Sequence, residues 1–253
     1  MAHQPLSGKT ALITGGSKGI GAATATHLSS LGAKIVLTYS TSSAPAEALV
    51  TRLGGPTRAL AIRADASSLP DIERLIASTT AFSGGSIDIL IPNAGVMAMS
   101  SVAHTTEAQF DATYELNVKG PYFLVQKALP YLRPGARVVF LSTSLCASST
   151  VAPDYLLYVS SKGAVEQMTR VLAKDLGGRG INVNAVAPGP TATELFLEGK
   201  PQQVIDNIAS LNPFKRIGEP DEIAKAIAYL SGDGGSWVNG QILRVNGGMT
   251  VGN

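Results

Sequence analysis

The stretch TGGSKGIG (14–21) lies where the apolar run TALIT (10–14) ends and a helical pattern over 19–31 begins. Its glycines at 15, 19 and 21 allow a tight turn, a close approach of main chain to an anion, and close packing of a helix on a sheet. Glycine also serves turns for conformational reasons alone. Its place between a first strand and a first helix, whose N-terminus attracts anions, indicates a dinucleotide-binding turn.

The rest of the chain repeats this strand and helix alternation. Short apolar runs rich in Ile, Val and Leu are typical of strands covered on both faces of a parallel sheet. They predict seven strands, at 10–14, 34–39, 58–65, 87–95, 137–144, 181–189 and 241–245. Helical patterns lie between them, at 19–31, 45–53, 69–82, 106–117, 119–132, 155–177 and 220–230. The fold class predicted is α/β, a Rossmann-type three-layer sandwich with a seven-stranded parallel sheet.

Length and composition fit one domain over 1–253, because 253 residues with 45% hydrophobic content can bury a large core. The segment 190–219 interrupts the alternation, and we expect it to form a substrate lid. Glycines after three helical patterns, at 32, 54 and 177–178, are expected to adopt the left-handed conformation that ends helices.

The end of the second strand bears on the choice of cofactor. A nicotinamide cofactor that lacks the 2′-phosphate is usually held there by an acidic residue. Here Thr38 is followed by Tyr39, Ser40, Thr41 and Ser42, with no carboxylate before Glu47. Hydroxyls can surround a phosphate, and Lys18 in the glycine turn can add a positive charge. The alternative is an ordinary loop, but the sequence favours NADP(H).

The pentapeptide YVSSK (158–162) raises a question of chemistry. On a helix, Tyr158 and Lys162 lie one turn apart on the same face. An ammonium close to a phenol stabilises the phenolate, so it lowers a pKa that is ordinarily ~10 toward the pH at which proton transfer is efficient. A solvated lysine beside a packed tyrosine is the simpler alternative for the pentapeptide alone.

Seven motifs in this order resemble the short-chain dehydrogenase/reductase family over nearly the whole chain. They are TGGSKGIG (14–21), NAG (93–95), Asn117 in ELNVKG, a serine in LSTS (141–144), YVSSK (158–162), NAVAPGPTAT (184–193) and NGG (246–248). Within the family the chain looks like the branch of NADPH-dependent carbonyl reductases that includes fungal polyhydroxynaphthalene reductases and 3-oxoacyl reductases.

The resemblance implies roles for individual residues. Tyr158 is expected to be the general acid or base, Ser144 to hold the carbonyl oxygen, Lys162 to bind the nicotinamide ribose and depress the tyrosine pKa, and Asn117 to anchor a water in a proton relay. The remaining cofactor-binding residues expected are Gly15, Ser17, Lys18, Gly19, Ile20, Gly21, Tyr39, Ser40, Thr41, Ser42, Asp65, Ala66, Asn93, Ala94, Gly95, Pro188, Gly189, Thr191 and Thr193.

Two departures from the family pattern affect these assignments. The usual pair of asparagines is Pro92-Asn93, which removes one main-chain donor. The serine lies fourteen positions before Tyr158, slightly more than is common, and Ser142 and Thr143 offer competing hydroxyls. The oxygen donor is therefore expected to be Ser144, with Ser142 kept as the alternative.

Other classes of function have little support in the sequence. A net charge of +2 with scattered basic residues argues against nucleic acid or membrane binding. The three histidines lack paired ligand spacing, so no metal site is predicted. No G-x-S-x-G elbow of a hydrolase occurs. One cysteine, the absence of a signal peptide pattern and the absence of a membrane-length apolar run favour a cytoplasmic protein.

The function expected is reduction of a ketone of a small or medium organic molecule by NADPH, reversible to alcohol oxidation. The same residues could serve an isomerase, epimerase or cyclase, and a non-catalytic NADP-binding regulator is a third hypothesis. Phe196, Leu197, Leu211 and Phe214 either line an apolar substrate pocket or pack the lid onto the sheet edge. The family resemblance implies a homotetramer or homodimer, with an apolar face of the helices at 106–132 and 155–177 against a twofold mate.

Overall fold

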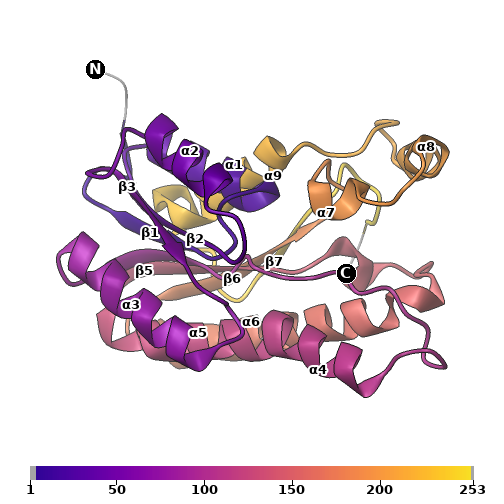
Figure 1. Cartoon of the computed structure of the whole chain (residues 1–253), viewed down its shortest axis with the longest axis horizontal. Helices are drawn as coiled ribbons and strands as arrows, with labels where there is room; N and C mark the ends of the chain where they lie inside the picture. The colour runs from indigo at the N-terminus through magenta and orange to yellow at the C-terminus, as the bar shows by residue number, and fades with distance from the viewer. Residues whose placement is uncertain (1–3, 252–253) are drawn as a thin grey trace.

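All seven strands of the computed structural model, which describes residues 4–251, belong to one parallel sheet. The order is β3-β2-β1-β4-β5-β6-β7 (Figure 1). Strand order reverses between β1 and β4, and in open α/β sheets ligands bind beyond the carboxyl ends of the strands at this point. The predicted sheet is confirmed, with strands β1 (Thr10–Ile13), β2 (Lys34–Tyr39), β3 (Ala59–Arg63), β4 (Ile87–Ile91), β5 (Leu132–Leu141), β6 (Asn182–Pro188) and β7 (Ile242–Val245).

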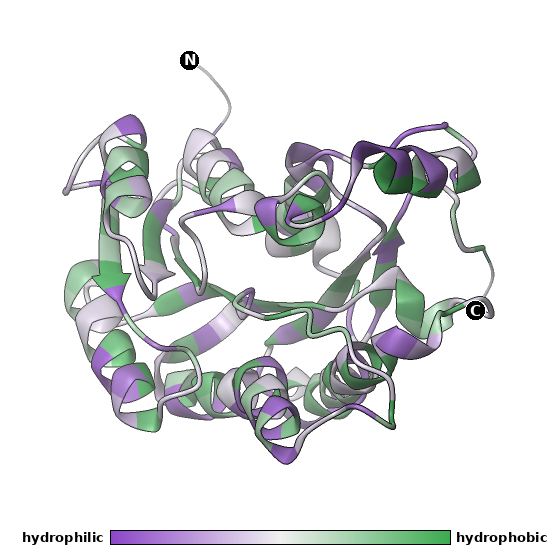
Figure 2. Cartoon of the chain, turned by 45° about the vertical axis from the view of Figure 1, so that its right-hand side comes forward, coloured by the Kyte–Doolittle hydropathy of each residue, from purple (hydrophilic) through white to green (hydrophobic). Residues whose placement is uncertain are grey.

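Helices cover both faces of the sheet (Figure 1). Strand side chains alternate between two cores, so Ile13 and Leu37 pack on one side while Leu12 and Val36 pack on the other. The apolar strands are enclosed between the helical layers (Figure 2). One layer contains α1 (Gly19–Ser30), α2 (Ala44–Arg52) and α9 (Pro220–Ser231); the other contains α3 (Leu69–Ser83), α4 (Glu107–Tyr114), α5 (Gly120–Ala128) and α6 (Leu156–Gly177).

Two of the three predicted glycine helix ends are confirmed. Gly32 and Gly54 have φ of 105° and 102°. The prediction is wrong at the end of α6, because Gly177 is the last helical residue and Gly178 keeps a right-handed conformation with φ of −62°. The chain reverses later, at Gly180 with φ of 73°, directly before it enters β6.

The helices predicted at 106–117 and 119–132 have different boundaries. Between α4 and α5 lies a π-helix, η1 (Glu115–Lys119), and after α5 a 3₁₀ turn, η2 (Leu129–Tyr131), leads into β5 at Leu132. Gly120 at the start of α5 touches the loop after β3, since a Cβ there would lie 2.1 Å from Ala66 O. The irregular turn therefore occurs where two segments approach too closely for a side chain, and π turns of this kind often accompany functional sites.

Residues 190–219 contain two helices that the sequence pattern did not predict, α7 (Glu194–Leu197) and α8 (Gln202–Leu211). No residue of α8 is buried, so the helix is not part of either core. The segment lies beyond the end of the sheet in Figure 1. Among residues 4–251, no helix has both the length and the apolarity to cross a membrane.

Candidate active site

Three elements bring the predicted catalytic residues together at the carboxyl ends of β4 and β5. Tyr158 and Lys162 lie on α6, with Lys162 Nζ 5.9 Å from the centre of the Tyr158 ring. Ser144 begins the 3₁₀ turn η3 (Ser144–Ala147) after β5, and Asn117 lies in η1. Tyr158 and Lys162 therefore lie one turn apart on the same face of α6, as predicted. Ser144 and Asn117 come from other elements and join them through the tertiary fold.

Asn117 fixes the loop after β4 against α6. Its Oδ1 accepts from Val96 N at 2.9 Å, while Nδ2 donates to Val96 O at 2.9 Å and to Ser161 Oγ at 3.0 Å. Gly95 is needed beside it, since a Cβ there would lie 3.0 Å from Asn117 Oδ1 and 3.4 Å from Lys162 Nζ. Both hydrogens of the Asn117 side-chain amide are thus donated within the protein. We therefore expect a water of the predicted relay to donate to an oxygen of Asn117.

The three hydroxyls after β5 point to different partners. Ser142 Oγ donates to Glu166 Oε1 at 3.0 Å, away from Tyr158. Ser144 Oγ donates to Ala187 O at 2.9 Å. Thr143 hydrogen-bonds to Tyr158, which lowers the phenol's pKa. Both serine hydroxyls thus donate to protein acceptors, and Thr143, which the sequence had offered only as a competitor, joins the residues around the phenol.

The pKa of Tyr158 shifts in the opposite direction to the predicted one, so this prediction is wrong. Burial raises the pKa of Tyr158 to about 12, and the hydrogen bond from Thr143 only partly opposes this. Burial also lowers the pKa of Lys162 to about 8. Lys162 Nζ donates to Leu141 O at 2.8 Å, so the ammonium is bound to strand β5 rather than to the phenol oxygen. Desolvation of the phenol therefore outweighs the hydrogen bond from Thr143.

The glycine turn has the geometry of a phosphate site. Gly15 and Gly19 have φ of 62° and 51°, and Gly15 N donates to Thr38 Oγ1 at 3.0 Å. A Cβ on Gly21 would lie 2.4 Å from Gly15 O, so α1 packs closely on the turn. No side chain caps the N-terminus of α1, and its first turn contains no acidic residue. The unpaired N–H groups there suit the pyrophosphate of a dinucleotide.

The loop after β4 is tied to this turn through Thr14. Thr14 Oγ1 accepts from Asn93 N at 3.0 Å and from Ala94 N at 3.1 Å. Asn93 Nδ2 donates to Thr14 O at 2.9 Å and to Gly15 O at 3.1 Å. The single asparagine after Pro92 is thus sufficient to join the two loops that border the predicted cleft.

Lys18 does not point to the loop after β2. Its Nζ lies 2.6 Å from Glu194 Oε2 in α7, so the predicted phosphate cation is paired with a carboxylate of the segment 190–219. The sequence reasoning missed Arg63, whose Nε donates to Ser40 O at 3.3 Å. Arg63 ends β3 directly opposite Tyr39 in the parallel register. A basic residue at the end of the third apolar run was the available signal, but its proximity to the loop after β2 depends on strand pairing.

Other predicted cofactor residues have local structural partners. Ser40, Thr41 and Ser42 are exposed, whereas Tyr39 is partly buried and packs on the core. Asp65 Oδ1 accepts from Ser67 N and Ser67 Oγ at 2.9 and 2.7 Å. The positions left available to a ligand at this end of the sheet are thus mainly hydroxyls and main-chain groups. Ser17 and Ile20 lie in the glycine turn and the first turn of α1, and Ala66 lies in the loop that approaches Gly120.

The segment after β6 packs against both the glycine turn and β7. A Cβ on Gly19 would lie 3.2 Å from Thr193 Cγ2, and one on Gly189 would lie 2.8 Å from Asn246 Cβ. Thr191 Oγ1 donates to Gly189 O at 2.9 Å, and Thr193 Oγ1 accepts from Phe196 N at the start of α7. Pro188 ends β6 beside Val245. The segment is thus held close to the predicted pyrophosphate site.

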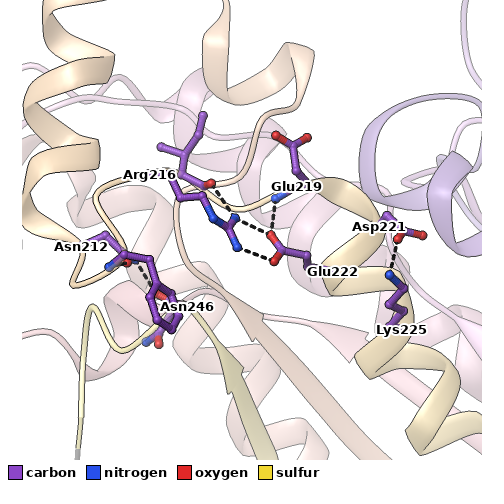
Figure 3. A network of polar contacts seen from close by, with 9 residues as sticks. Asn212, Arg216, Glu219, Asp221, Glu222, Lys225 and Asn246 are labelled. Atoms are coloured by element: carbon purple, nitrogen blue, oxygen red, sulfur yellow. Dashed lines mark hydrogen bonds and ion pairs between the residues drawn. The ribbon is translucent and has the colours of Figure 1, made fainter.

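The far end of the segment 190–219 is anchored by polar contacts (Figure 3). Arg216 forms two hydrogen bonds to Glu222 in α9, at 2.7 and 2.6 Å, and this contact lowers the pKa of Glu222 to about 2. Asn212 Nδ2 donates to Asn246 O at 2.8 Å. Next to these anchors, Leu211 and Phe214 are 70% and 69% exposed, so packing onto the sheet edge does not explain these two apolar side chains.

Comparison with known proteins shows to which family the chain belongs. The family model described as enoyl-(acyl carrier protein) reductase matches residues 15–250. The chain belongs to the short-chain dehydrogenase/reductase family. It is 37% identical to the "NADPH-dependent aldehyde reductase-like protein, chloroplastic" of Arabidopsis thaliana over 96% of this chain and 95% of that protein. It is 38% identical to the "Short chain dehydrogenase mdpC" of Emericella nidulans over 97% of both.

Solved structures of the short-chain dehydrogenase/reductase family superpose closely on the chain. A short chain dehydrogenase from Burkholderia cenocepacia in complex with NADP is 34% identical, with a TM-score of 0.91 over 98% of this chain and 100% of that one. A blue fluorescent protein from a metagenomic library in complex with NADPH gives the same identity, TM-score and coverage. The predicted cofactor, NADP(H), is the one bound in these two structures. Among residues 4–251, no group of three or more metal-ligating side chains occurs.

Proposed function

We propose that this member of the short-chain dehydrogenase/reductase family reduces a ketone or aldehyde carbonyl of a small or medium organic molecule with NADPH, and catalyses the reverse oxidation. The observation that carries the proposal is the cluster of Thr143, Ser144, Tyr158 and Lys162 beside an uncapped glycine-rich helix start. Family membership and the NADP-bound relatives support it. Bound NADPH would supply the hydride.

The residues of the chain have separate roles in this proposal. The turn 15–21 and the start of α1 would hold the pyrophosphate, while Ser40, Arg63 and Lys18 would surround a 2′-phosphate. Tyr158 is protonated at neutral pH, where its pKa is raised to about 12, and the ammonium of Lys162 close to its ring would stabilise the phenolate that forms as the proton passes to the carbonyl oxygen. The hydroxyl of Ser144 would donate a hydrogen bond to the same oxygen as negative charge develops on it.

The alternatives differ in what they require of the phenol and of the cofactor. An isomerase, epimerase or cyclase would use the same hydroxyls without net oxidation of NADPH. A regulator would bind NADP and turn nothing over. The four predicted catalytic residues meet at one site, which favours catalysis over the regulator.

The decisive experiment follows NADPH absorbance with a panel of ketones, aldehydes, quinones and 3-oxo esters. We expect at least one substrate to be reduced, and Tyr158→Phe to lower kcat by about 10² to 10⁴ because the general acid is lost. NADPH binding, measured by fluorescence, should be retained. Tyr155→Phe removes a neighbouring phenol from the turn before α6 and is the matched control. NADPH binding without oxidation on any substrate would contradict the proposal.

The choice of cofactor is tested in the same assay. Ser40→Asp places a carboxylate where the 2′-phosphate is expected, so its charge should repel NADPH and shift preference toward NADH. Thr51→Asp on α2 adds the same charge away from the loop after β2 and serves as the control. Wild-type preference for NADH, or no shift in Ser40→Asp, would show that the loop does not bind the phosphate.

Two further properties are proposed. We propose self-association as a dimer or tetramer, supported by exposed aromatic side chains on α4 and α5, where Phe110 and Tyr122 are 46% and 50% exposed. We also propose that the protein is cytoplasmic, which its single cysteine suits, although two relatives from Arabidopsis thaliana are named as chloroplastic. Fractionation of the source cells would test the compartment.

A further inference from the structure

Glu166 is a buried carboxylate that the reaction described above does not use. The residue is 7% exposed and lies on α6 among buried neighbours that include Lys162 and Thr169. Its Oε1 accepts from Ser142 Oγ at 3.0 Å, and its Oε2 lies 3.3 Å from Arg170 Nη2. Arg170 is about half-exposed, so the contacts of Glu166 inside the protein are those to Ser142 and to the thiol of Cys146.

The position of Glu166 continues the catalytic face of α6. Tyr158, Lys162 and Glu166 are spaced four residues apart, so they follow one side of the helix. Lys162 Nζ donates to Leu141 O, and Glu166 accepts from the next residue of the same strand end, Ser142. Two successive helical turns thus hold Leu141, the last residue of β5, and Ser142, the residue that follows it.

The strand end held in this way leads directly to the hydroxyls around the phenol. Thr143, which hydrogen-bonds to Tyr158, and Ser144 are the next two residues. Cys146 Sγ lies 3.8 Å from Ser142 Oγ and 3.7 Å from Val159 O, so this turn also follows α6. A displacement of Ser142 relative to the helix would move Thr143 and Ser144 relative to Tyr158.

Burying a carboxylate costs several kcal/mol, and an apolar side chain of similar size is often as stable or more stable at such a site. Packing of α6 on β5 alone does not require a charge. A hydrogen bond restricts the direction between two groups, which an apolar contact does not. The arrangement therefore suits the fixing of geometry better than the provision of stability.

We propose that Glu166 is a positioning residue for the reaction, which acts through Ser142 to fix Thr143 and Ser144 relative to Tyr158. The proposal rests on the proposed reductase function. It assigns to Ser142 the role of a link to α6, in place of the role of oxygen donor that the sequence had left open.

A double-mutant cycle on kcat tests the proposal with the full-length enzyme. We expect Glu166→Ala and Ser142→Ala each to lower kcat by about 10- to 100-fold, since a small misplacement of reacting groups is costly. The NADPH dissociation constant, measured by fluorescence, should change less than about 2-fold because neither residue belongs to the phosphate-binding turn 15–21. The double variant should be no slower than the slower single variant, because one hydrogen bond transmits both effects.

Conservative and control variants separate positioning from folding. Glu166→Gln keeps an acceptor for Ser142 Oγ and should restore kcat to within about 3-fold of wild type, because most of the geometry depends on the hydrogen bond rather than on charge. Asp175→Asn changes an exposed carboxylate on the same helix and should leave kcat unchanged. Melting temperatures define the folded fraction of each variant.

Three outcomes would overturn the proposal: unchanged kcat in folded Glu166→Ala, losses that multiply in the double variant, or no recovery in Glu166→Gln. If Glu166→Ala does not fold, the Ser142→Ala and Glu166→Gln pair decides alone, because the first must lose kcat and the second must keep it. Failure of the wild type to oxidise NADPH is a separate result, which contradicts the proposed function itself.

Discussion

The site depends at the residue scale on two ionisable groups, the partly buried Tyr158 and the buried Lys162, whose pKa values shift in opposite directions toward their neutral forms. Burial raises the first to about 12 and lowers the second to about 8. Both shifts have the same cause, since the protein interior solvates a charge less well than water does. The lysine ammonium has one recorded hydrogen-bond acceptor in the described chain, Leu141 O, so its charge is incompletely compensated.

This leads to a pH-dependent stability for the cofactor-free protein. The pKa of Lys162 falls from 10.5 to about 8 on folding, so the unfolded chain binds more protons between these two values. The free energy of unfolding of wild type, relative to Lys162→Met, should therefore rise with pH from about 8 to about 10.5, by at most ~1.4 kcal/mol per pH unit. Urea denaturation at several pH values measures the difference.

Lys174→Met, at an exposed position on the same helix, is the matched control, and its difference from wild type should not change with pH in this window. Parallel stability curves for wild type and Lys162→Met would show that the buried ammonium is not destabilised in the folded chain.

At the element scale, the segment 190–219 is joined to the glycine turn by one exposed ion pair. Lys18 on the turn and Glu194 in α7 approach to 2.6 Å, and Thr193 contacts Gly19 next to them. The same lysine is one of the proposed partners of the 2′-phosphate. A carboxylate of the lid thus competes with the phosphate for this cation when the lid is in the position described here.

Removal of that competitor should strengthen binding of NADPH but not of NADH. Glu194→Gln is expected to lower the NADPH dissociation constant by up to about 5-fold, a size consistent with an exposed ion pair. Titration of cofactor fluorescence at low and high salt gives the measurement, and the difference should shrink as salt screens the charge.

Glu198→Gln is the control, because Glu198 directly follows α7 and the substitution changes the net charge by the same amount. Equal changes in both variants, or an equal gain for NADH, would mean that Lys18 does not contact the 2′-phosphate.

At the scale of the whole molecule, apolar side chains remain exposed on one helical layer. Phe110 and Tyr114 on α4 stack with ring centres 4.4 Å apart, and Tyr122 on α5 is half-exposed beside them. Val171 on α6, in the same layer, is 66% exposed. A second copy of the chain would remove this surface from water, as the expectation of a homodimer or homotetramer requires.

A charge placed in this surface should prevent self-association. Tyr122→Glu is expected to shift the mass in solution from a multiple of the 26.1 kDa chain mass to that of one chain, because an unpaired carboxylate is costly at a buried interface. Light scattering coupled to gel filtration measures the mass. Val102→Glu alters an exposed apolar residue in the loop before α4 and should leave the assembly intact. A wild-type monomer would contradict the expectation.

The parallel sheet and most residues of the candidate site could be predicted from the amino-acid sequence alone. Apolar runs predicted all seven strands, because a strand buried on both faces needs apolar residues at successive positions. The four-residue spacing placed Tyr158 and Lys162 on one helix face for an equally local reason. Family motifs then indicated Ser144, Asn117 and the glycine turn as one site.

The interactions among these site residues could be known only from the tertiary structure. The raised pKa of Tyr158, the π turn that carries Asn117, the pairing of Lys18 with Glu194 and the position of Arg63 beside Ser40 all depend on segments that are distant in sequence. Burial and strand register arise from packing, and their effect on a charge depends on what surrounds it in space. The four-residue spacing therefore predicted that the Tyr158 phenol and the Lys162 ammonium lie close together, but it predicted a lowered pKa for the phenol where the structure has a raised one.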